Sequence, residues 1–166
     1  MFAAFIPIVL IEAIILRRSL MLEFVAALKL SARINLISTI AGIPLAWLLM
    51  FLLELATGIP IGMWFDGHHA SQLPDSIGAL LSVTLWSAWV GPGNGSGYWM
   101  VPAASLSLLI PSFLISYWLE AMVAGTVLAD RQRTLVRSAV LRANLATYAM
   151  LAVLVGAWLT YSIVTQ

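Results

Sequence analysis

The sequence contains no cysteine and few charged residues. Without cysteine, the chain forms no disulfide, no thiolate metal site and no thioether link to haem. Only 9% of its 166 residues are charged, against about 25% in soluble domains, and 62% are hydrophobic. So few polar and charged residues could not cover the surface of a soluble fold of this size. The composition therefore predicts an integral membrane protein with a single domain. The net charge of +1 gives no reason to expect a nucleic-acid partner.

Histidine is also scarce, and the only two, His68 and His69, lie outside the apolar stretches. A haem b held by histidines inside membrane helices is therefore excluded for this chain alone. Together with Asp66, the two histidines could supply mixed nitrogen and oxygen ligands to a divalent metal. Their spacing matches no recognised ligand pattern, however, so we expect a hydrated outer loop, no bound metal and no cofactor.

Three long stretches carry no charge at all, namely residues 34–53, 76–119 and 143–166. Each has at least the roughly 20 residues that an apolar helix needs to span the hydrocarbon core. The first sixteen residues are also apolar, but they lack an initial positive cluster and include Glu12. This pattern predicts a retained membrane helix rather than a signal peptide.

The basic residues fall into two clusters, and the region between them has none. These are Arg17, Arg18, Lys29 and Arg33, and then Arg131, Arg133, Arg137 and Arg142. Short basic connectors mark the cytoplasmic side of a membrane, so we expect connectors 17–33 and 129–142 to be cytoplasmic and both termini to lie outside. Transmembrane helices are then predicted at 2–18, 34–57, 101–128 and 140–164. Residues 19–31 could either lie along the interface or extend the first helix.

The apolar stretch at 76–91 does not fit this topology as a further span, because it would place the second basic cluster on the wrong side. We therefore predict a re-entrant or interfacial helix there, closed by the glycine-rich run at 91–97. Aromatic residues flank it and are expected to anchor it at the headgroup level. They are Trp86, Trp89, Tyr98 and Trp99.

A short motif occurs twice: ARINLIS at 32–38 and LRANLAT at 141–147 share Arg-x-Asn-Leu-x-Ser/Thr. Other matches keep the same order at a slowly growing separation: Ile6-Pro7 with Ile110-Pro111, Glu12-Ala13 with Glu120-Ala121, and Trp47 with Trp158. The sequence therefore predicts two parallel two-helix repeats, at about 1–57 and 101–166, with an outer insert at about 58–100. The predicted fold class is an all-α membrane protein with four transmembrane helices.

Each predicted repeat has one glutamate inside its first helix. A carboxylate in hydrocarbon needs a polar partner. We expect Glu12 to pair with Arg33 or Asn35 near the cytoplasmic boundary. By the same argument, Glu120 is expected to pair with Arg142 or Asn144. Such groups either hold helices together or relay protons or ions; the cationic partners favour the first interpretation.

These observations predict a non-catalytic accessory or scaffold subunit of a larger membrane complex. Its expected partners are lipid and other integral membrane subunits, and it could form a homo-oligomer. The alternative is a small oligomeric transporter or channel that uses the buried Glu, Arg and Asn groups. An enzyme using the loop at 64–75 is a third possibility, but the sequence displays no catalytic constellation.

Overall fold

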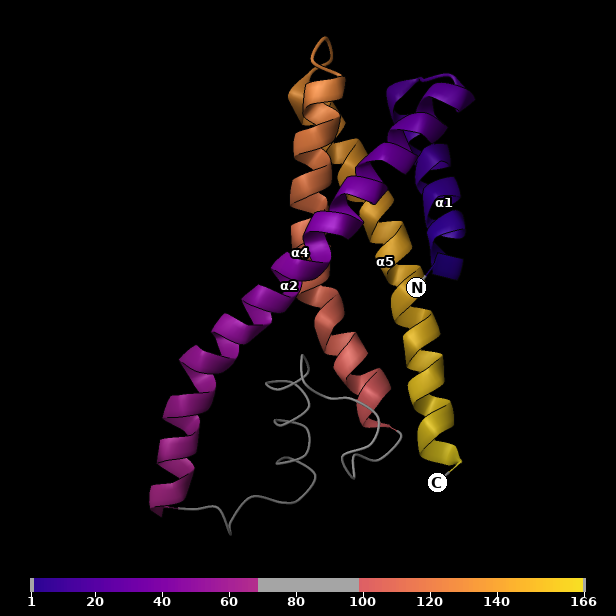
Figure 1. Ribbon diagram of the computed structural model, residues 1–166. Helices are drawn as coiled ribbons and strands as arrows, with labels where there is room; N and C mark the ends of the chain where they lie inside the picture. The colour runs from indigo at the N-terminus through magenta and orange to yellow at the C-terminus, as the bar shows by residue number, and fades with distance from the viewer. Residues whose placement is uncertain (1, 69–98, 166) are drawn as a thin grey trace. The chain divides into compact units, whose positions relative to one another are not determined.

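The computed structural model describes residues 2–68 and 99–165, and in these ranges the chain is helical throughout apart from short turns. Figure 1 shows the four helices in chain order. They are α1 (Phe2–Leu20), α2 (Phe24–His68), α4 (Met100–Val127) and α5 (Arg133–Val164). The predicted helix at 76–91 lies outside the described residues, as do the expected anchors Trp86, Trp89 and Tyr98.

Three of the described helices are long and apolar enough to cross a membrane. They are the Phe24–Leu52 part of α2 and the whole of α4 and α5. α1 has 19 residues, about 28 Å of helix, but it contains Glu12, Arg17 and Arg18 and is not among these three. The all-helical class and a membrane location therefore agree with the composition.

The helices that follow the basic connectors begin earlier than predicted. α2 starts at Phe24 rather than near residue 34, and α5 starts at Arg133 rather than near residue 140. Their first two turns also pack into the protein, since Leu30 and Val136 are buried. Lysine and arginine are good helix formers, so basic residues did not interrupt either helix. The predicted connectors at 17–33 and 129–142 are therefore wrong in length: the turns comprise only residues 21–23 and 128–132.

The chain divides into two compact units, and the first comprises Met1–Pro44 and Ser112–Leu151. Its apolar core combines large and small side chains from all four helices. Small residues allow helix backbones to approach closely in membrane proteins. The buried members are Leu16, Leu20, Leu30, Ile34, Ala124, Val136, Ala139, Val140 and Ala143.

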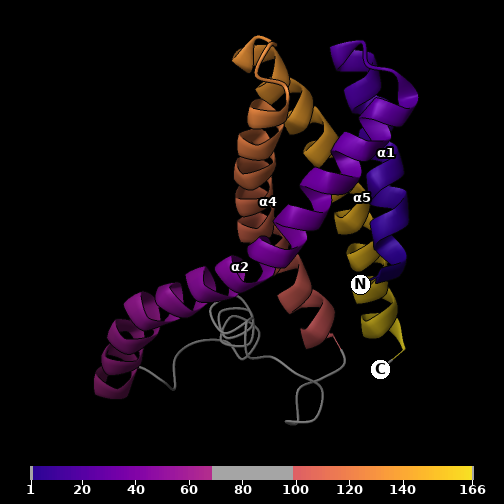
Figure 2. The same cartoon turned by 45° about the horizontal axis from the view of Figure 1, so that its top comes forward.

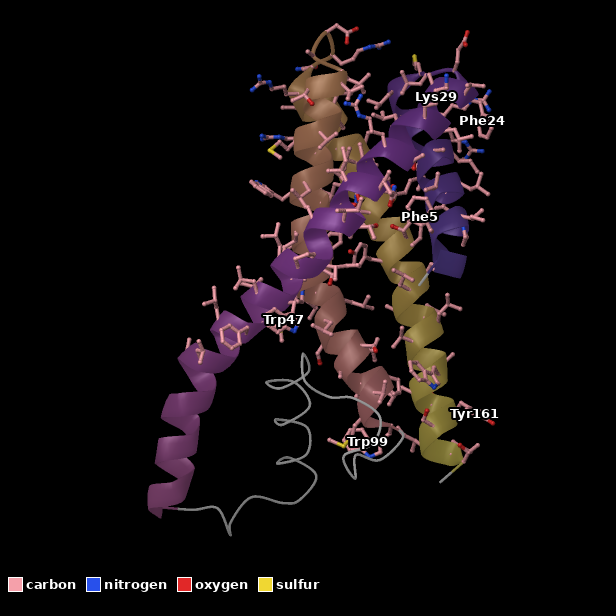
Figure 3. All side chains as sticks on the ribbon, viewed as in Figure 1. Phe5, Phe24, Lys29, Trp47, Trp99 and Tyr161 are labelled. Carbon is pink, nitrogen blue, oxygen red and sulfur yellow. The ribbon has the colours of Figure 1, made fainter. Side chains whose placement is uncertain are left out.

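Within this first unit, the turn from α1 to α2 and the turn from α4 to α5 lie at the same end (Figures 1 and 2). Phe24 and Lys29, just after the first turn, are found at this end, whereas Phe5 lies farther along α1 (Figure 3). The Arg17 guanidinium carbon is 6.0 Å from the centre of the Phe24 ring. Both basic clusters therefore flank turns at one end of the unit.

The second unit comprises Leu45–Pro111 and Ala152–Gln166. Among its described hydroxyl side chains, Ser105 Oγ donates to Val101 O at 2.9 Å and Thr160 Oγ1 donates to Gly156 O at 3.0 Å, both within their own helices. Such back-bonding satisfies a hydroxyl without a neighbouring helix. The outer surface is aromatic and apolar, and Figure 3 labels two of its exposed residues, Trp47 and Tyr161.

α1 ends in a left-handed turn that is occupied by an unfavourable residue. Met21 has a φ of 51°, and the Leu22 N–H donates to Arg17 O at 3.2 Å. Glycine is the usual residue at this position of a helix C-terminus because it lacks a Cβ. The Met21 side chain is 90% exposed, so its removal breaks no core contact.

We therefore expect Met21→Gly to raise the unfolding free energy by about 1 kcal/mol, through relief of backbone strain. Titration of the purified protein from mild detergent into dodecyl sulfate measures this change. Lys29→Gly, at an exposed position within α2, is the matched control and should lower stability by about 1 kcal/mol. A destabilised Met21→Gly variant would contradict the assignment of strain.

Candidate functional site

The two intramembrane glutamates are both almost completely buried in the first unit, each 1% exposed. Glu12 lies on α1 and Glu120 lies on α4. Asn35 on α2 and Asn144 on α5 are also buried. These four residues form the centre of a hydrogen-bonded cluster, which we call the carboxyl network.

Glu12 is bonded to the helix that follows it in the chain. The Asn35 side-chain amide donates to Glu12 Oε2. Four residues earlier on α2, Ser31 Oγ donates to Val9 O at 3.0 Å, which also ties α2 to α1. Residues four apart share one helix face, so Ser31 and Asn35 both bond to α1 from the same face of α2.

Glu120 accepts three side-chain hydrogen bonds. Asn144 Nδ2 donates to its Oε2 at 2.6 Å, and Ser116 Oγ donates to its Oε1 at 2.9 Å. Ser38 Oγ, on α2, donates to the same Oε1 at 2.8 Å. Donors on α2, α4 and α5 therefore converge on one carboxyl group.

The Ser38–Glu120 bond joins the α1–α2 pair to the α4–α5 pair, and a second bond joins them with its donor on α5 and its acceptor on α1. Thr147 Oγ1 on α5 lies 3.1 Å from Glu12 Oε1 and can donate to it. Thr147 follows Asn144 by three residues, just as Ser38 follows Asn35. Each carboxyl thus accepts a bond from the asparagine of the next helix and from a hydroxyl of the other helix pair.

A cavity of about 170 Å³ lies beside the carboxyl network. This volume exceeds the space that one water molecule needs about tenfold. Its polar lining includes both carboxyls and several hydroxyls, and Tyr148 packs edge-on against Phe113 with ring centres 5.3 Å apart. The polar lining residues are Glu12, Asn35, Ser38, Thr39, Ser112, Ser116, Glu120, Thr147 and Tyr148.

Arginine does not take part in the network. Arg33 and Arg142 are exposed, and neither bonds a carboxyl within residues 2–68 and 99–165. The one ion pair in those ranges joins Arg131 Nε to Asp130 Oδ2 at 3.8 Å on the surface. Of the two partners that the sequence offered for each glutamate, the structure brings the asparagine to the carboxyl. The expected pairing of the glutamates with arginine was the reason to favour a purely structural role. The two arginines, however, are not bonded to the carboxyls.

The sequence reasoning missed the hydroxyl donors Ser31, Ser38, Ser116 and Thr147. Helical spacing could have found them, since three of them lie three or four residues from Asn35 or Asn144 and the fourth lies four residues from Glu120. One acceptor of the cluster stays without a donor among the described residues: Asn144 Oδ1 is buried and accepts no hydrogen bond there.

The proposed metal ligands are not tested by this structure. His69 lies outside the described residues, as do the side chains of Asp66 and His68. In the part of the chain that is described, no three His, Asp or Glu residues gather as a metal site. Trp99, the described member of the expected aromatic anchors, is partly buried just before α4.

Comparison with protein-family models, curated proteins and solved structures finds no match to this chain.

The exposed position of the arginines leads to a prediction. Arg33→Gln and Arg142→Gln, alone or together, should change the unfolding free energy by less than about 0.5 kcal/mol, because exposed side chains outside the network contribute little. Dodecyl sulfate titration is again the measurement. A loss as large as that of Asn35→Ala or Asn144→Ala would show that the arginines do support the carboxyls.

Proposed function

We propose that this protein is a non-catalytic accessory or scaffold subunit, which packs its helices against other transmembrane subunits and lipid. The observation that carries this proposal is the low burial of the apolar spans. In their most apolar windows, 28% of residues are buried for α2, 17% for α4 and 11% for α5. Most residues of each window are therefore partly or fully exposed.

The side chains on these outer surfaces suit helix packing as well as lipid. Three tryptophans are about half exposed: Trp47 (45%), Trp118 (60%) and Trp158 (48%). Large aromatic side chains contribute strongly to protein interfaces because they bury much area in few rotamers. Exposed tryptophans in both units fit a subunit that assembles or stabilises a larger complex.

We further propose that α1 also crosses the membrane, and that α1–α2 and α4–α5 are two parallel repeats. The exchange of hydroxyl donors between the helix pairs supports this interpretation, since Ser38 bonds Glu120 and Thr147 bonds Glu12. The positive residues at both turns support a cytoplasmic position for these turns, with both termini outside.

Co-purification tests the scaffold proposal. The tagged chain, extracted from its native membrane in a mild detergent, should carry a stoichiometric integral membrane partner. A tryptophan scan of exposed apolar positions, including Ile110 and Val153, then separates protein contact from lipid contact. Lipid accommodates a larger side chain, whereas a packed interface does not.

At least one scanned position should release the partner without lowering the thermal stability of this chain. A stable, partner-free monomer from the native membrane would contradict the proposal. So would a scan in which every variant retains the same partners.

One observation favours a second candidate, a small oligomeric transporter or channel. Two buried carboxyls, neither bonded to a cation of the described residues, line a cavity in the first unit. Carboxyls within a membrane commonly mark ion or proton paths. Four helices rarely enclose a path alone, so this function requires self-association. In proteoliposomes, proton or ion flux should then vanish in the double variant Glu12→Gln Glu120→Gln and persist in Glu23→Gln, a control at an exposed position. Equal flux in both variants excludes this candidate.

A further inference from the structure

A second cavity, separate from the carboxyl network, lies between the end of α4 and the start of α5. It has a volume of about 410 Å³ and is contained in the first unit. We call it the α4–α5 groove. Its lining residues are Tyr117, Trp118, Ala121, Met122, Gly125, Thr126, Arg133 and Arg137.

The α5 wall of the groove is basic. Arg133 and Arg137 are four residues apart and therefore lie on one face of α5. Both are exposed, and neither forms an ion pair with an acid of the described chain, whose one surface pair is Arg131 with Asp130. The groove therefore offers two uncompensated guanidinium groups, which bind phosphate oxygens in bidentate fashion.

The α4 wall is mainly apolar and aromatic. Tyr117, Ala121 and Gly125 repeat at every fourth residue along one face of α4, over about 12 Å of helix. Gly125 leaves the floor open, since a Cβ placed there would meet no heavy atom within 4 Å. Next to this face, Trp118 and Met122 are exposed. This wall therefore offers an apolar surface for a hydrocarbon chain.

The groove thus combines paired cations at a helix turn with an apolar channel along the adjoining span. We propose that it binds an anionic phospholipid, whose phosphate lies at Arg133 and Arg137 and whose acyl chain lies along Trp118 and Gly125. Basic pockets between membrane helices bind lipid headgroups in this way. The inference depends on neither candidate function above.

Quenching of Trp118 fluorescence tests this proposal. The full chain is reconstituted in phosphatidylcholine vesicles that contain increasing fractions of phosphatidylglycerol with brominated acyl chains, which quench tryptophan on contact. Subtraction of the Trp118→Phe signal isolates Trp118 from the other tryptophans. Half-maximal quenching should need a much lower fraction of brominated phosphatidylglycerol than of brominated phosphatidylcholine.

Two variants address the two walls separately. Arg133 and Arg137 bond the phosphate directly in this proposal, which surface arginines do not, so Arg133→Gln Arg137→Gln should raise the half-maximal fraction at least about tenfold. Gly125→Leu fills the floor and should abolish the preference for phosphatidylglycerol. It adds a good helix former where there is open space, so the helix is retained.

The matched control is Arg131→Gln Arg142→Gln, which removes the same charge at exposed positions that do not line the groove. Its half-maximal fraction should stay within about twofold of the wild type, as expected for surface charge alone. The proposal is overturned if this control shifts as far as the groove variant. It is also overturned if Trp118 shows equal quenching by the two lipids, or if Gly125→Leu leaves the preference unchanged.

Discussion

Glu120→Ala should lower the unfolding free energy by about 3 kcal/mol, one of the two largest losses expected for a single substitution in this chain. Three side-chain donors, from Ser38, Ser116 and Asn144, converge on this carboxyl. Hydrogen bonds in membrane proteins contribute about 0.6 kcal/mol each, and the vacated space beside the existing cavity adds to the loss. Dodecyl sulfate titration of the purified protein measures the change.

Two further variants separate the network from the mere loss of an acid. Glu120→Gln retains an acceptor oxygen for Ser38 and Ser116, but its NH₂ group faces the Asn144 NH₂ group and that hydrogen bond is lost. About a third of the Glu120→Ala loss in unfolding free energy is therefore expected. Glu23→Ala removes the same atoms from an exposed position and should have no measurable effect. An equal loss of unfolding free energy in Glu23→Ala and Glu120→Ala would show that the carboxyl network does not stabilise the fold.

Ala143→Leu should be nearly as damaging, with a loss of about 1–3 kcal/mol from overpacking. Ala143 is fully buried in the core of the first unit, together with Ala124 and Ala139. It precedes Asn144, so a larger side chain that displaces α5 also moves the amide away from Glu120. The variant should therefore lose more stability than its added volume alone predicts.

Ala149→Leu provides the matched control for this second prediction. It makes the same substitution on the same helix, but at an exposed position that faces away from the core. Lipid accommodates the added side chain, so the unfolding free energy should stay within about 0.5 kcal/mol of the wild type. Equal losses in the two variants would show that Ala143 is not packed against neighbouring helices.

The sequence was sufficient to predict the helical class and the membrane location. Long uncharged stretches determine these features directly, because hydrocarbon solvates apolar side chains and excludes charged ones. The involvement of Asn35 and Asn144 was also readable, since each stands at the same place in a repeated motif. Arg33 and Arg142 were equally plausible partners by sequence, because spacing alone does not say which face of a helix is buried.

The helix boundaries and the hydroxyl donors were harder to predict. Basic residues at 29–33 and 133–142 suggested connectors, yet lysine and arginine are compatible with helix, and Leu30 and Val136 draw these turns into the core. Serine and threonine within membrane helices most often bond the preceding turn. Ser38 and Thr147 do reach another helix, and the signal for this was their place three residues after Asn35 and Asn144 in the repeated motif. Ser105 and Thr160 have no such place and bond their own helices.

We propose that the two helix pairs stand the same way up, joined through the carboxyls of Glu12 and Glu120. Cysteine labelling tests it most directly, because the chain has no cysteine of its own. Glu23→Cys and Asp130→Cys each place one thiol at an exposed position in one of the two turns. With a membrane-impermeant maleimide, both should react from the cytoplasmic face and neither from the outer face. Reaction of the two thiols from opposite faces would contradict the account.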